Sequence, residues 1–267
     1  MSVSPASQCA REILRELQID RPELLSYLPE ICMERGAFVR EAQLDSSDAR
    51  LTVRGDQGII TVKPNSSYQA RTRFSIAHEL GHFELHRRLT PSQVCDMRAL
   101  NDWYQRSEAQ CRETEANEFA AEFLMPAQFM RPDIYGERPS LQLLDRLATK
   151  YQTSLLATAR RFIDLTTDAC AVILFKPDIV QTVWRSELFE QQRFWIDSKL
   201  DPRSFAWAAA SGKEMPDQPR EVGASCWLNV PSYFADEPVL EQSRFFNGIS
   251  LGVCLLQLKS AQLIRFS

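Results

Sequence analysis

The sequence has no long hydrophobic stretch and no sign of a targeting segment. Nowhere in its 267 residues do about 18 apolar residues follow one another, which is the length needed to cross a bilayer. The opening stretch, MSVSPASQCAREILREL, lacks the basic stretch and apolar run of a secretory signal peptide. We therefore expect a cytoplasmic protein that makes no contact with a membrane.

The sequence also lacks an excess of positive charge and any CxxC cysteine pair. The formal net charge of -4 argues against nucleic-acid binding over the whole surface, although one basic face is compatible with it. The seven cysteines are odd in number and scattered along the chain. This pattern indicates reduced thiols rather than a disulfide framework or a cysteine zinc site.

The chain is longer than one hydrophobic core usually fills, and its first part mixes helical and strand patterns. Apolar residues at helical spacing predict helices at 8–18 and 21–36. Three short β-like runs separated by turn-forming residues then predict a small antiparallel sheet. These runs are AFVREAQL, ARLTVR and GIITVK.

The middle of the chain reads as helical. A long connection at 89–106 leads to a helix that runs from about 107 to 125, with Ser107 and Gln110 forming a capping box. A helical pair follows at 139–151 and 154–165.

From Ala169 onward, strand patterns dominate, and a domain boundary is expected near residue 167. The predicted strands are ACAVILF, QTVWR, SCWLNV and ISLGVCLLQLK, with helical pieces between them. The four tryptophans of this part are expected to pack in a core rather than line a cofactor pocket. They are Trp184, Trp195, Trp207 and Trp227.

The sequence has only three histidines, and all of them lie in the stretch RTRFSIAHELGHFELHRR as His78, His82 and His86. Residues four apart on a helix differ by about 40° around the axis and about 6 Å along it, so His78 and His82 can bind one ion. Glu79 points about 100° away and is better placed to take a proton from a metal-bound water. HExxH thus predicts two zinc ligands and a general base.

A chance HExxH on a solvated helix is the alternative to a metal site. The flanking Phe74, Ala77, Leu80 and Leu85 are apolar at helical spacing, which indicates a packed helix. Gly81 costs about 1 kcal/mol relative to alanine inside a helix, and a close approach by another backbone would explain it. We therefore favour metal binding.

A catalytic zinc needs a third protein ligand. His86 lies about 12 Å from His78 along a straight helix, so we expect it to support the site or to lie at the surface. The helix at 107–125 offers Glu113 at the start of a stripe of mostly small residues, and we predict Glu113 as the third ligand. The stripe comprises Glu113, Ala116, Asn117, Ala120, Ala121 and Leu124.

The helix at 107–125 carries further polar residues, for which we predict either a supporting role at the site or a position in solvent. Asn117, one turn after Glu113, is placed to support the ligand carboxylate or a histidine, although a polar residue on a packed stripe needs no such role. Glu115, Glu118 and Glu122 fall on other faces of the helix and are expected in solvent.

The blocks RFSIAHELGHFELH and EANEFAAEFLMP together resemble the ImmA/IrrE family of metallopeptidases, and the likeness covers about residues 8–165. The resemblance implies that His78, His82 and Glu113 bind the metal and that Glu79 is the catalytic base. This agrees with the choice made from helix geometry.

The expected fold is α+β and has three parts. Residues 1–130 would form a zincin-like metallopeptidase core with the small antiparallel sheet, and residues 131–167 a helix-turn-helix-like helical subdomain. Residues 168–267 would form a small C-terminal α/β lobe of unknown role. Radiation-response members of the family carry a GAF-like domain there, which is an analogy of fold alone.

Members of this family cut helix-turn-helix repressors, so the resemblance implies a zinc-dependent endopeptidase with one specific protein substrate. Manganese also suits histidine and carboxylate ligands. The strand GIITV is expected at a sheet edge beside the metal, where it would pair with the substrate backbone. DNA binding through 141–165 is disfavoured, because the second helix begins with the apolar run SLLA.

Two rival functions remain open at the level of sequence. In the first, the protein is a non-catalytic regulator whose metal organises a surface for a repressor or for DNA. In the second, the zinc site is structural and closed, which requires four protein ligands, with His86 as the fourth.

Overall fold

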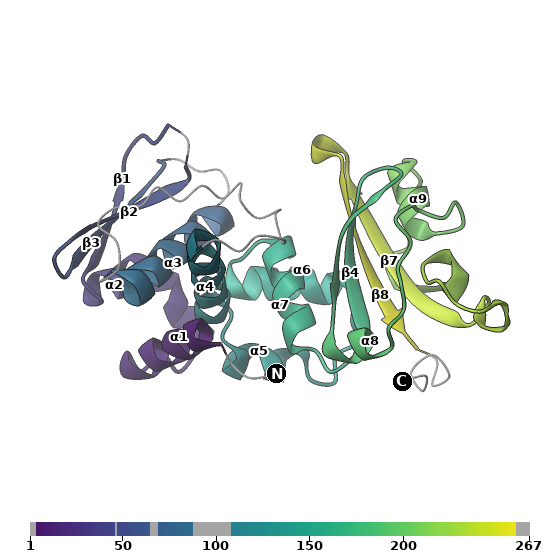
Figure 1. Cartoon of the computed structure of the whole chain (residues 1–267), viewed down its shortest axis with the longest axis horizontal. Helices are drawn as coiled ribbons and strands as arrows, with labels where there is room; N and C mark the ends of the chain where they lie inside the picture. The colour runs from purple at the N-terminus through teal and green to yellow at the C-terminus, as the bar shows by residue number, and fades with distance from the viewer. Residues whose placement is uncertain (1–3, 46, 65–68, 88–107, 260–267) are drawn as a thin grey trace. The chain divides into compact units, whose positions relative to one another are not determined.

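The computed structural model describes residues 4–45, 47–64, 69–87 and 108–259 (Figure 1). The connection expected at 89–106 and the cap expected at Ser107 lie outside these residues.

The chain divides into two compact units. The first comprises Met1–Met130 with Ala148–Ala157, and the second comprises Arg131–Leu147 with Thr158–Ser267. The helical subdomain expected at 131–167 is shared between the two units, and the three-part domain division stays a prediction. The fold is a mixture of α-helices and two small sheets, as the α+β prediction requires.

Along the sequence, the first unit has short helices, then a three-stranded sheet, and then two long helices. The helices and strands are α1 (Pro5–Glu16), η1 (Pro22–Tyr27), α2 (Leu28–Glu34), β1 (Ala37–Glu41), β2 (Ala49–Arg54), β3 (Gln57–Val62), α3 (Gln69–His86) and α4 (Glu108–Leu124).

The sheet of the first unit differs from the prediction in two ways. Its strand order is β1-β3-β2, with β1 parallel and β2 antiparallel to β3, so the sheet is mixed rather than antiparallel. GIITV lies in β3, the central strand, and the expectation of an edge strand there was wrong. The two polar edge strands cover both sides of this most apolar strand, which satisfies its backbone groups.

The core of this unit lies between the sheet and α3, where Ile60 and Val62 share one buried cluster with Leu80 and Phe83. α3 and α4 lie side by side (Figure 1). A Cβ atom on Gly81 would stand 3.0 Å from Cδ1 of Phe119, so glycine permits this close approach. The neighbour is a side chain of α4 rather than the backbone expected.

Glu122 was predicted to lie in solvent, but it is fully buried. Its Oε1 accepts a hydrogen bond from Nε of Arg11 at 2.9 Å, and its Oε2 accepts one from Nη2 of Arg11 at 3.2 Å. The backbone N–H of Ala127 also donates to Glu122 at 3.1 Å. A buried charge persists only with such partners, and this one fixes the C-terminal end of α4 against α1.

The second unit holds a five-stranded antiparallel sheet with the strand order β5-β4-β8-β7-β6. Its central strands β4 and β8 are buried along most of their length. The elements after α4 are α5 (Ala127–Ile134), α6 (Leu141–Tyr151), α7 (Leu155–Leu165), β4 (Cys170–Phe175), β5 (Val180–Arg185), α8 (Glu187–Gln191), α9 (Phe205–Ala210), β6 (Arg220–Gly223), η3 (Ala224–Cys226), η4 (Ser232–Phe234), β7 (Pro238–Phe246), η5 (Asn247–Ile249) and β8 (Leu251–Leu258).

The sequence pattern misassigned part of this lobe. SCWLNV is not a strand, because it begins inside η3, while β6 and β7 were not predicted. β7 reads as polar because it carries Glu241, which is buried and accepts hydrogen bonds from Nε1 of Trp227 at 2.8 Å and from Oγ of Ser243 at 2.8 Å. Burial raises the pKa of the Glu241 carboxyl despite these donors.

The tryptophans of the lobe do not share one environment. Trp227 is 1% exposed and lies in the core, as predicted, whereas Trp195 is 76% exposed and the prediction was wrong for it. The six cysteines of the described residues form no disulfide. Within the same residues, no helix has both the length and the apolar character needed to cross a bilayer.

The ion pair between Arg11 and Glu122 gives a first testable prediction. Arg11→Ala should lower the free energy of unfolding by about 1–3 kcal/mol, because a buried carboxylate loses its charged partner. Circular dichroism during thermal unfolding measures the change. Arg15→Ala, at an exposed position of the same helix, is the control and should change stability by less than about 0.5 kcal/mol. Equal losses in the two variants would contradict the role given to Arg11.

Candidate metal centre

The three histidines project from one helix into the protein interior. α3 is helical throughout, so the spacing predicted from HExxH holds. His78, His82 and His86 are only 2%, 4% and 5% exposed, respectively. This burial is opposite to what a chance cluster on a solvated helix face would show. It also corrects the expectation that His86 could be a surface residue.

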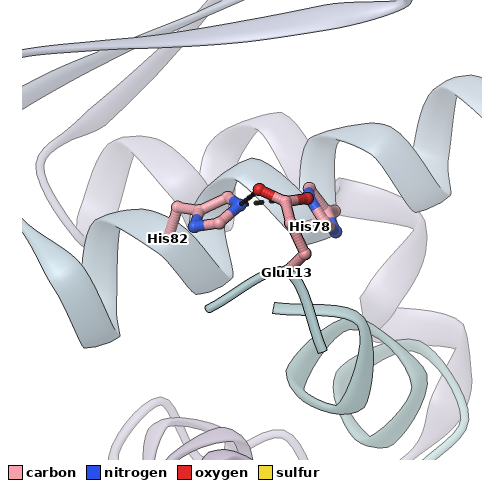
Figure 2. Close-up of side chains that lie close together, drawn as sticks. All are labelled: His78, His82 and Glu113. Carbon is pink, nitrogen blue, oxygen red and sulfur yellow. Dashed lines mark hydrogen bonds and ion pairs between the residues drawn. The ribbon is translucent and has the colours of Figure 1, made fainter. Parts of the chain in front are cut away.

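α4 delivers a carboxylate to the same point. Figure 2 shows Glu113 reaching from α4 so that its carboxylate faces the rings of His78 and His82. Its Oε2 lies 3.3 Å from Nε2 of His78, and its Oε1 lies 3.3 Å from Nε2 of His82. The two Nε2 atoms are 3.1 Å apart. Among the described residues, only these three form a group of side chains that could hold a metal ion.

The distances between these atoms fit a metal site. In a tetrahedral zinc site with bonds of about 2.0–2.1 Å, the ligand atoms stand about 3.4 Å apart. The separations of 3.1 Å and 3.3 Å between the three side chains are close to that value. The described residues supply three ligand atoms, so a fourth corner of such a tetrahedron would be left for a water molecule, as in catalytic zinc sites.

Asn117 contacts the ring of His78. Nδ1 of His78 lies 3.0 Å from Oδ1 of Asn117, so the ring donates its Nδ1 proton to the amide oxygen. Nε2 of His78 then carries a lone pair, the form in which histidine binds metals. The supporting role predicted for Asn117 agrees with this contact, although the role itself stays a prediction.

His86 does not face the three side chains as a fourth ligand. Its Nδ1 lies 3.0 Å from Nδ1 of His82, and its Nε2 lies 2.9 Å from Oε2 of Glu115. Because both ring nitrogens are engaged in these contacts, neither has a lone pair directed at the centre. The geometry therefore argues against the closed structural site with His86 as its fourth ligand.

The charge state of the centre suits a cation. Burial by itself would raise the pKa of the Glu113 carboxyl, but the neighbouring rings of His78 and His82 hold it well below its ordinary value. Burial lowers the pKa of His82 below 6.5, and this outweighs the opposing effect of Glu113. An ionised carboxylate at Glu113 and a neutral ring at His82 are the forms in which these side chains bind a metal.

Glu79 and Glu115 lie outside the group of three converging side chains. Glu79 is 2% exposed and is not one of the three converging side chains, as expected for a base rather than a ligand, and its catalytic role stays a prediction. Glu115 was expected in solvent, yet its half-exposed side chain contacts His86. It lies about 200° around α4 from Glu113, so helical periodicity gave no signal for it. Glu118 is exposed, as predicted.

The fold and the candidate site are those of an α+β protein that can bind a metal ion, and comparisons with known proteins agree with this class. Residues 32–162 match the model of the IrrE N-terminal-like domain, Peptidase_M78. The chain therefore carries a domain of the ImmA/IrrE family.

The fold extends beyond that domain. A Mycobacterium tuberculosis transcriptional regulator matches with a TM-score of 0.57 and 16% sequence identity, over 94% of this chain and 75% of that one. At this identity the likeness concerns the fold alone. No curated protein matches the sequence significantly.

Metal binding by the isolated protein is the second testable prediction. The full chain should bind one zinc ion per molecule, removable with a chelator, and Glu113→Ala should lose it because one of three ligands is gone. Elemental analysis after dialysis against dilute zinc measures the content. Glu118→Ala, an exposed carboxylate on the same helix, is the matched control and should keep the ion. Retention of zinc by Glu113→Ala would remove Glu113 from the ligand set.

Proposed function

We propose that this protein is a zinc-dependent endopeptidase. The observation that carries the proposal is the convergence of His78, His82 and Glu113, with ligand atoms 3.1–3.3 Å apart. The match of residues 32–162 to a peptidase family supports the same conclusion. Manganese is the alternative ion, because histidine and carboxylate ligands suit both metals.

In this proposal the side chains divide the work between binding and proton transfer. His78, His82 and Glu113 hold the ion, which when bound supplies Lewis-acid chemistry and lowers the pKa of water. Glu79, one residue after the first ligand, takes the proton of the attacking water as the general base. It then delivers that proton to the amine that leaves from the cleaved peptide bond.

The proposed substrate is a helix-turn-helix repressor held in an extended conformation. β3 cannot receive it, because both of its edges are already paired. β2 is an edge strand of the described sheet and packs against α3, the helix that carries the histidines. We therefore propose that the substrate backbone pairs with the outer edge of β2, where N–H and C=O groups are available for strand addition.

Residues 141–165 do not support a role in reading DNA. Arg160, on α7, pairs with Asp164 at 3.4 Å and lies over the ring of Trp184 at 5.8 Å. Arg161 is 8% exposed. Because these arginines are engaged or buried, we assign the α6–α7 pair a structural or substrate-docking role.

Replacement of the proposed base is the third testable prediction. Glu79→Gln should keep its zinc but cleave at a rate lower by about 10²–10⁴-fold, because the amide cannot take a proton. The assay incubates the protein with zinc and a candidate helix-turn-helix repressor from the same organism, and follows repressor fragments by mass spectrometry. Glu118→Gln is the control and should cleave normally.

The same assay separates the peptidase from the non-catalytic regulator. A regulator would bind the repressor without producing fragments, in the original protein as well as in Glu79→Gln. Equal cleavage by the original protein and Glu79→Gln would instead show that Glu79 is not the base.

A further inference from the structure

We propose that Glu115 and His86 form a positioning relay that fixes the tautomer and the orientation of His82. The inference rests on the proposed function, because it concerns how the protein prepares one of its metal ligands. The relay consists of Glu115 on α4, then His86 and His82 on α3. The relay has two contacts, and neither of them involves a metal ion.

The relay begins at the carboxylate. Oε2 of Glu115 lies 2.9 Å from Nε2 of His86. A carboxylate only accepts hydrogen bonds, so Nε2 of His86 must carry the proton in this contact. In the neutral ring, Nδ1 of His86 is then an acceptor.

The second contact determines which ring nitrogen of His82 carries the proton. Nδ1 of His86 lies 3.0 Å from Nδ1 of His82, and a single proton must occupy the space between them. Because His86 accepts there, His82 donates its Nδ1 proton. Nε2 of His82 is left with a lone pair, and it is this atom that stands 3.3 Å from Oε1 of Glu113.

α4 thus orients both histidine ligands as well as providing the third one. Asn117 fixes the Nδ1 tautomer of His78 directly, through a contact of 3.0 Å. Nδ1 of His82 instead contacts His86, and His86 in turn contacts Glu115 on α4. The two arms give both rings the same tautomer, with both Nε2 lone pairs facing Glu113.

The alternative is that Glu115 forms an ordinary surface ion pair with no effect on the site. Its side chain is 48% exposed, and exposed pairs contribute little to stability. Stability alone therefore does not separate the two explanations. The tautomer of His82 does, because a surface ion pair has no reason to set it.

The decisive experiment is nitrogen NMR of the metal-free full chain, with ¹⁵N in the histidine rings. The sequence has only three histidines, so each ring nitrogen can be assigned. We expect protonated Nδ1 in His78 and His82, and protonated Nε2 in His86. In Glu115→Ala the Nε2–H form of His86 and the Nδ1–H form of His82 should no longer dominate, while His78 stays unchanged. Glu118→Ala is the matched control on the same helix and should leave all three rings unchanged.

Zinc affinity provides a second measurement, by competition with a chromophoric chelator. Loss of a group that orients a ligand typically weakens metal binding by about 10–100-fold, and we expect this for Glu115→Ala and for His86→Ala. Because the two residues act through one path, the double variant should bind about as weakly as His86→Ala alone. Glu118→Ala should bind zinc like the original protein.

Two results would overturn the relay. One is a metal-free protein in which His82 carries its proton on Nε2. The other is zinc affinity in Glu115→Ala equal to that of the original protein, or losses that add in the double variant.

Failure of the proposed function has a different signature. If the original protein bound no zinc while its three rings showed the expected tautomers, the hydrogen-bond relay would stand and its purpose in metal binding would fall. If zinc bound normally but no peptide were cleaved, the relay would stand and the peptidase would fall.

Discussion

The candidate site depends on how closely α3 and α4 approach each other. At their contact, a Cβ on residue 81 would stand 3.0 Å from Cδ1 of Phe119, so a larger residue than glycine would force the Phe119 side chain to shift by a few tenths of an ångström. The separations of 3.3 Å between Glu113 and the two histidines depend on the same close approach of α3 and α4. One glycine in the HExxH turn is therefore part of the geometry of the centre, although it binds nothing.

The second constraint acts at the far end of α4. Glu122 is buried and held by Arg11 and by the N–H of Ala127, which fixes the position of α4 along its axis. A helix rises about 1.5 Å per residue, so a small slide would carry Glu113 out of reach of the rings. Packing at Phe119 sets the distance between the helices, and the ion pair at Glu122 sets their register.

Much of the candidate site could be predicted from the sequence, because helical periodicity depends only on residues that are close together in the chain. The spacing of His78 and His82 on one helix, and the place of Glu113 at the head of a small-residue stripe, follow from helical periodicity alone. The contact between Glu115 and His86 was not predicted, because the long side chain of Glu115 reaches His86 from the opposite side of its helix. The burial of Glu122 was not predicted either. In a sequence, a glutamate in a buried ion pair cannot be told from a solvated one, because its partner Arg11 lies 111 positions away.

The sheets were harder to predict for the same reason. β3 became the central strand through pairing with β1, a parallel contact that no local pattern announces. In the second unit, β7 carries Glu241 where a buried strand would be expected to be apolar, and hydrogen bonds from Trp227 and Ser243 offset part of the cost of burying it. Pairing between strands and burial of polar groups are decided by tertiary neighbours.

The anchors of α4 have a consequence for the metal-free form of the proposed peptidase. Phe119, Arg11 and Glu122 hold the helix through contacts made only of protein atoms, and the ring orientations are set by hydrogen bonds. These contacts involve no metal ion, so in the proposed peptidase removal of the ion would leave the helices assembled. The supply of free metal in the cell would then set how much of the protein is active, without unfolding and refolding.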